Sequence, residues 1–96
     1  MTTEEVLGAV HAERIRQDER WGIQNHDVMK WLVILGEEFG EGCEAALDFK
    51  SGDVTLLHPC QELQHVAAVA VAMIESLERQ AGGWEGKSSM QSQEEI

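Results

Sequence analysis

Apolar residues recur three and four positions apart in three stretches of the chain, and this spacing predicts three helices. The first is expected from about residue 3 to residue 20, where apolar residues are so sparse that the helix should be peripheral. The second is expected over about 28–49, and the third carries Pro59 in its first turn and runs to about residue 80. No stretch alternates as a strand does. We therefore expect an all-α fold with three main helices per chain.

Local signals agree with these boundaries. Thr2 and Thr3 precede Glu4 and Glu5, as a hydroxyl cap precedes acidic residues at the positive end of a helix dipole. Asp27 is expected to cap the second helix after the turn that begins at Trp21. The apolar positions expected along the first helix are Val6, Leu7, Val10 and Ile15, and those along the second are Leu32, Val33, Phe39, Cys43, Ala46 and Leu47.

The third helix is apolar on every side between residues 66 and 74. One small chain cannot cover such a helix, so the sequence predicts a homodimer or homotetramer in which the helices form an oligomeric bundle. Gly36, Gly40 and Gly42 lie inside the second helix, where each costs about 1 kcal/mol relative to alanine. Three such residues indicate close approach of another backbone or of a ligand.

A chain of 96 residues is long enough for one domain. We expect a helical domain over residues 1–80 and a disordered C-terminal tail over 81–96, where glycine, serine and glutamine dominate. Cys43 and Cys60 lie in apolar, helix-like settings, so they are predicted to be free, buried thiols in a reducing cytoplasm. The longest apolar run is far shorter than the roughly 20 residues of a membrane span, which predicts a soluble protein with no membrane partner.

The net charge of −11 opposes binding to nucleic acid or to an anionic membrane, and favours multivalent cations. Glu38 and Glu41 are three residues apart and project from one face of the second helix. Glu62 and His65 repeat this spacing on the third helix. If the two helices pack antiparallel, both pairs face one gap and can share an ion. Glu37, Glu44 and Asp48 are interpreted as solvated charges.

The run Gly36-Glu37-Glu38-Phe39-Gly40-Glu41, followed after a spacer by the run from Glu62 to Val69, resembles the signature of the all-α nucleoside triphosphate pyrophosphohydrolases of the MazG and dCTPase group. That signature is ExxE, a spacer, then ExxD. The resemblance covers about residues 21–77, and residues 13–32 resemble a MazG-like subgroup found in bacteria and phages. It implies an enzyme that cleaves a nucleoside triphosphate between the α and β phosphates, giving the monophosphate and pyrophosphate.

The resemblance also implies roles for individual residues. Glu38, Glu41 and Glu62 would bind Mg²⁺ and neutralise phosphate charge, while Glu37 or Glu38 would orient the attacking water. His65 stands where the family has an aspartate. Because imidazole is a poor ligand for Mg²⁺, either the three glutamates suffice, or the preferred ion is a softer one such as Mn²⁺, or activity is reduced.

Four residues are candidates for binding the substrate. His26 lies where dCTPase-like relatives carry a substrate-facing histidine, although a helix-start histidine also bonds to local backbone. Trp21 and Trp31 offer flat faces on which a base could stack, or they belong to the core. Lys50 either meets phosphates or is an exposed charge.

Two other functions remain open. Glu62-x-x-His65 matches the di-iron motif of ferritin-like bundles, in which a homodimer could supply two copies. The chain could also be a non-catalytic acidic helical interaction module, and His65 is the residue that favours this alternative.

Overall fold

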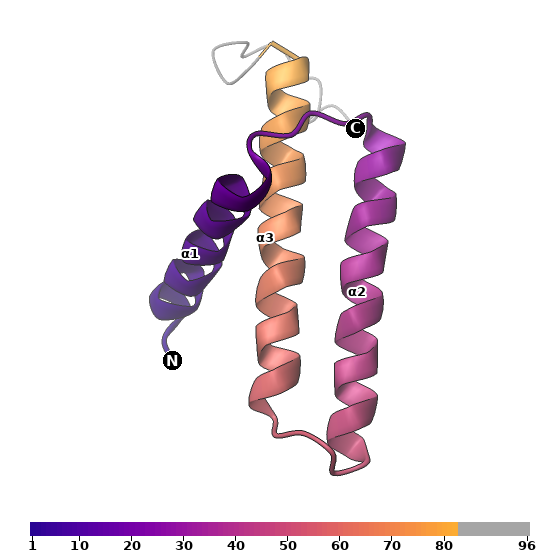
Figure 1. Cartoon of the computed structure of the whole chain (residues 1–96). Coiled ribbons are helices and arrows are strands. Elements are labelled where there is room, and N and C mark those ends of the chain that lie inside the picture. Colours follow the sequence, from indigo (N-terminus) through magenta and orange to yellow (C-terminus); the bar gives the residue numbers. More distant parts are fainter. Residues whose placement is uncertain (83–96) are drawn as a thin grey trace, which may run out of the picture.

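The computed structural model describes residues 1–82, and these form three α-helices: α1 (Thr3–Trp21), α2 (Val28–Lys50) and α3 (Leu57–Gln80). Over these residues, the prediction of an all-α fold with three main helices is confirmed. α2 and α3 form an antiparallel hairpin, and α1 lies on the opposite side of α3 from α2 (Figure 1). Within the described residues α1 packs against α3 and not against α2. The predicted tail lies outside the described residues from residue 83 onward.

The helix ends follow the local chemistry of the sequence. The Thr2 hydroxyl accepts from the Glu5 backbone N–H at 3.1 Å, and the Glu5 carboxylate accepts from the Thr2 N–H at 3.0 Å, which completes a capping box. Asp27 caps α2 by accepting from the Lys30 N–H at 2.8 Å. Gly22 ends α1 with φ of 72°, a conformation that glycine adopts without a steric cost.

The core of one protomer is small. Trp31, Val69 and Ala72 form its centre, and Ile34, Leu35, Met73 and Leu77 pack around them. α1 adds little, because Val10 is the only residue of its expected apolar stripe that is buried. Arg14 joins Val10 in the contact with α3. The expected peripheral character of α1 therefore agrees with its packing.

The apolar stripe expected along α2 points away from the protomer. Most of its residues are exposed, Phe39 and Leu47 by 60% and 63%, whereas Trp31 and Ala45 are the buried residues of this helix. Cys43 belongs to this stripe and is exposed, and Cys60 in the first turn of α3 is exposed as well, so the prediction of buried thiols is wrong. Helical periodicity identifies an apolar face, but it does not identify which neighbour covers that face.

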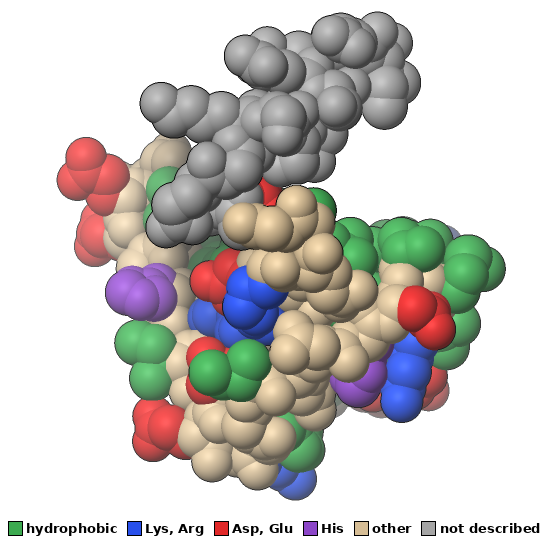
Figure 2. Space-filling view, turned by 90° about the horizontal axis from the view of Figure 1, so that it is seen from above, with side chains coloured by type: hydrophobic (Ala, Val, Ile, Leu, Met, Phe, Trp, Pro, Cys, Tyr) green, Lys and Arg blue, Asp and Glu red, His purple; other side chains and the backbone are tan. Residues whose placement is uncertain are grey.

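An apolar groove runs along this outward face between α2 and α3. Its volume is about 390 Å³, and it is lined by Leu32, Leu35, Gly36, Phe39, Val66, Ala67 and Ala70. Seen from the end that carries the α1–α2 connector, hydrophobic side chains gather on the α2 side of the molecule (Figure 2). A Cβ atom placed on Gly36, Gly40 or Gly42 would meet no other described part of the protomer within 4 Å, so the close approach expected there is not made within one chain.

None of the helices in residues 1–82 combines the length and hydropathy that crossing a membrane requires.

Candidate functional site

Three side chains from the two antiparallel helices meet in the gap between α2 and α3. Glu38 comes from α2, and Glu62 and His65 come from α3; one ligand atom from each lies within 4.8 Å of the others. The three-residue spacing on α3 places Glu62 and His65 on one face, and antiparallel packing brings Glu38 opposite them. The sequence predicted that Glu38 and Glu41 face the same gap as Glu62 and His65. Of these four residues, all but Glu41 belong to the converging group.

The electrostatics of this cluster favour a bound cation. Burial raises the pKa of Glu38, the charges of Glu41, Glu62 and Glu13 raise it further, and His65 opposes them. Glu38 Oε2 and Glu62 Oε2 are buried and make no hydrogen bond within the described residues. Buried anionic oxygens without partners are costly, and a divalent cation with oxygen ligands removes that cost. The donor set therefore fits a divalent metal ion.

Glu41 and Glu37, the other carboxylates predicted for the site, do not belong to the group of three converging side chains. Glu41 is exposed and is close enough to Glu38 to raise its pKa, but it is outside the group of three converging ligands. Glu37, which with Glu38 is one of the two residues to which the resemblance gives the attacking water, is exposed on α2.

Glu13 of α1 is the residue of this region that the sequence did not assign. Its carboxylate Oε2 lies 3.7 Å from His65 Nε2, and its side chain is 12% exposed. Arg16 donates to the same carboxylate from Nε and Nη2 at 2.7–2.9 Å. No spacing rule links Glu13 to a residue of α3, because their proximity depends on how α1 docks.

A pocket of about 240 Å³ adjoins the cluster, and Glu38 lies in its wall. Two tryptophans, Trp21 and Trp31, line it together with the side chains of Gln17 and Gln24. The remaining lining residues are Arg14, Asp18, Gly22, Ile34, Val69 and Ala72. The pocket therefore brings the exposed ring of Trp21 and two glutamines together with Glu38.

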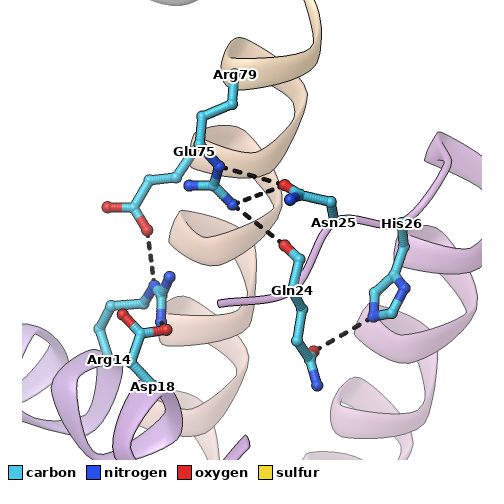
Figure 3. Close-up of polar contacts among 7 residues, drawn as sticks. All are labelled: Arg14, Asp18, Gln24, Asn25, His26, Glu75 and Arg79. Atoms are coloured by element: carbon cyan, nitrogen blue, oxygen red, sulfur yellow. Dashed lines mark hydrogen bonds and ion pairs between the residues drawn. The ribbon is translucent and has the colours of Figure 1, made fainter. Parts of the chain in front are cut away.

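The connector between α1 and α2, residues 22–27, is tied to the end of α3 by hydrogen bonds from Ser76, Arg79 and Gln80, which we term the connector clasp. Figure 3 shows the bonds of Arg79. Arg79 donates to Asn25 Oδ1 and to the Gln24 carbonyl, and Gln80 donates to the His26 carbonyl at 2.8 Å. The wholly buried hydroxyl of Ser76 also donates to Asn25 Oδ1, at 3.3 Å. The clasp holds the connector where Gly22 and Gln24 line the pocket.

Arg14, which lines this pocket, ties α1 to α3 through Glu75 (Figure 3). Its guanidinium donates to Glu75 Oε1 at 2.8 Å and to Asp18 Oδ1 at 2.5 Å. Burial alone would lower the pKa of Arg14, but the hydrogen bonds and charges of Asp18 and Glu75 outweigh it and raise the pKa. Arg14 is therefore a permanently charged anchor for α1.

Of the four candidate substrate-binding residues, Trp21, Trp31 and His26 lie at or next to the pocket, whereas Lys50 does not. Trp31 is 3% exposed and Trp21 is 56% exposed, and both line the pocket. His26 contacts Trp31 edge to face, with ring centroids 5.0 Å apart, and its Nε2 lies 3.3 Å from Gln24 Oε1. Lys50 is exposed at the far end of α2, about 18 Å along the helix from Glu38, so one protomer does not bring it to this site.

No protein-family model, curated protein or solved structure matches the chain.

Proposed function

We propose that the protein is a metal-dependent nucleoside triphosphate pyrophosphohydrolase of the MazG-like type, which releases a nucleoside monophosphate and pyrophosphate. The observation that carries this proposal is the position of Glu38, which belongs both to the carboxylate cluster and to the wall of the aromatic pocket. A nucleotide with its base among Trp21, Trp31 and Gln24 would direct its phosphates toward the ion held beside Glu38.

The residues have distinct roles in this proposal. Glu38, Glu62 and His65 hold the ion, Glu41 contributes negative charge at the rim, and Glu37 or Glu38 orients the water that attacks in line. The bound Mg²⁺ or Mn²⁺ supplies charge neutralisation for the phosphates. A strongly acidic chain needs such an ion to hold an anionic substrate.

We also propose that the working form is a homodimer or homotetramer in which a second copy covers the groove between α2 and α3. The support is physical: the groove is lined by apolar residues and glycine, and Phe39 and Leu32 are largely exposed beside it. The open space at Gly36 and Gly40 lets another helix approach closely. The same assembly could bring Lys50 of one copy near the site of another.

The test is a product assay on a panel of ribonucleoside and deoxyribonucleoside triphosphates, with Mg²⁺ and with Mn²⁺. Phosphorus NMR distinguishes pyrophosphate from orthophosphate. Pyrophosphate together with the monophosphate supports the proposal, and orthophosphate alone contradicts it. Oxidation of Fe²⁺ without nucleotide turnover would instead identify a di-iron protein, for which two copies must meet because the chain carries one Glu-x-x-His motif.

A further inference from the structure

The two nitrogen atoms of His65 face two different carboxylates. Nδ1 lies 3.5 Å from Glu62 Oε2, the buried oxygen that has no hydrogen-bond partner in the described residues. Nε2 lies 3.7 Å from Glu13 Oε2 on the other side of the ring. The ring therefore presents one nitrogen to the cluster between α2 and α3 and the other to α1.

The first of these distances suits two ligands of one ion. Donor atoms that bind a divalent ion at about 2.1 Å lie roughly 3.0–3.5 Å apart when they occupy neighbouring positions. The separation of His65 Nδ1 and Glu62 Oε2 is at the upper end of this range.

The position of the Glu13 carboxylate beside His65 Nε2 suits a contact that supports a metal-binding histidine. A histidine that binds a metal through one nitrogen usually donates its other N–H to a carboxylate, which fixes the tautomer and the orientation of the ring. Glu13 is suited to this role, because its side chain is nearly buried and Arg16 holds its carboxylate in place. Its 3.7 Å separation from His65 Nε2 exceeds a hydrogen bond, so a small rotation of either side chain must close it.

We propose that His65 is a metal ligand through Nδ1, and that Glu13 is the positioning residue that accepts its Nε2–H. This inference rests on the metal site of the proposed function and extends it to α1. A nitrogen ligand is better suited to transition-metal ions than to Mg²⁺, so the site prefers Mn²⁺ and Co²⁺. Glu13 supports that preference only while His65 is present.

The experiment is calorimetric titration of Mn²⁺, Co²⁺ and Mg²⁺ without nucleotide into the full-length wild type, Glu13→Gln, His65→Asp and the double variant. Glu13→Gln should weaken Mn²⁺ and Co²⁺ binding by roughly 10–100-fold and change Mg²⁺ binding much less. His65→Asp should restore an oxygen ligand and shift the preference toward Mg²⁺. In the His65→Asp background, Glu13→Gln should have little further effect. Glu19→Gln, which removes an exposed carboxylate of the same helix, is the matched control.

Pulsed electron paramagnetic resonance of bound Mn²⁺ gives a second measurement, because a directly bound ¹⁴N should be detected in the wild type and lost in His65→Asp. If Glu13→Gln does not fold, Glu13→Asp keeps the charge on a shorter side chain and should show the same selective loss. The inference is overturned if the wild type shows no ¹⁴N coupling, or if Glu13→Gln weakens all three ions equally with or without His65. The proposed function fails separately, if the metal binds as described and no pyrophosphate is released.

Discussion

The guanidinium group of Arg79 donates to Asn25 Oδ1 from both Nε, at 3.2 Å, and Nη2, at 3.0 Å, across 54 positions of the chain. The same Nη2 reaches the Gln24 carbonyl at 3.1 Å. Two residues of the connector are therefore fixed by one side chain of α3. Lysine could not reproduce this contact, since its ammonium group lacks the planar fork of donors.

Arg79→Gln should release the connector and leave the cluster of Glu38, Glu62 and His65 in place. We expect a modest loss of stability, about 0.5–1.5 kcal/mol, because water replaces part of these exposed hydrogen bonds. Hydrogen exchange at residues 22–27 should accelerate, and KM for nucleotide should rise more than kcat falls. Lys30→Gln, which removes an exposed positive charge near the same end of α2, is the control. Unchanged exchange in the connector of Arg79→Gln would refute this role.

Replacing Glu38, Glu41 or Glu62 with glutamine should lower nucleotide turnover by orders of magnitude while the fold persists, because each change removes negative charge at the proposed ion. Glu44→Gln and Glu78→Gln should change little. Steady-state pyrophosphate release and circular dichroism measure the two effects. Full turnover in Glu38→Gln and Glu62→Gln would mean that these carboxylates do not serve the reaction.

The raised pKa of Glu38 gives a separate prediction for the metal-free protein. A carboxylate whose pKa is raised by folding destabilises the folded state above that pKa, and the cost disappears as the pH falls below the unfolded-state value. At neutral pH, Glu38→Gln should therefore raise the melting temperature of the metal-free protein and reduce the further increase produced by Mn²⁺. If metal-free Glu38→Gln melts at a lower temperature than the metal-free wild type, the charged Glu38 carboxylate is stabilised by its surroundings.

The sequence was informative where the physics is local. Thr2 and Asp27 cap their helices as their positions indicated, and the spacing of Glu62 and His65 determined their shared face. It was uninformative where the outcome depends on tertiary packing. Glu13 reaches His65 only because Arg14 docks α1 on α3 through Glu75.

The same limit explains the wrong prediction for Cys43. Its helix has an apolar stripe, but α3 packs on the side that carries Trp31 and Ala45, so the stripe is left outside the protomer. Periodicity alone cannot choose between a neighbour in the same chain and one in another copy.

Two substitutions test the folding of one chain and the proposed assembly independently. Val69 is 6% exposed and packs with Trp31, so Val69→Asp should unfold the protomer, since an unpaired buried carboxylate costs roughly several kcal/mol. Phe39 is 60% exposed, so Phe39→Asp should leave the helices intact and separate the copies of the proposed assembly. Light scattering and circular dichroism distinguish the two results. A folded wild-type monomer of 10.7 kDa at micromolar concentration would rule out the proposed assembly.

Substitution of the two tryptophans of the pocket should have different effects on stability, because Trp31 belongs to the core and Trp21 does not. Trp31→Ala should lower the free energy of unfolding by about 3–5 kcal/mol. A loss of activity in this variant could then come from unfolding and would not identify a role in binding. Trp31→Phe keeps an aromatic ring and removes an indole N–H that has no acceptor in the described residues, so it should be tolerated far better than Trp31→Ala. Thermal unfolding of the two variants measures the difference.

Trp21→Ala removes an exposed ring from the pocket wall, so stability should change by less than about 1 kcal/mol. If the base stacks on this ring, KM should rise roughly 5–160-fold, corresponding to the 1–3 kcal/mol typical of base stacking, and metal affinity should be unchanged. Trp21→Phe should restore most of the binding. Equal KM values for the wild type and Trp21→Ala would place the base elsewhere and leave Trp21 as an exposed residue at the end of α1, where the Arg20 guanidinium lies 5.0 Å from its ring centroid.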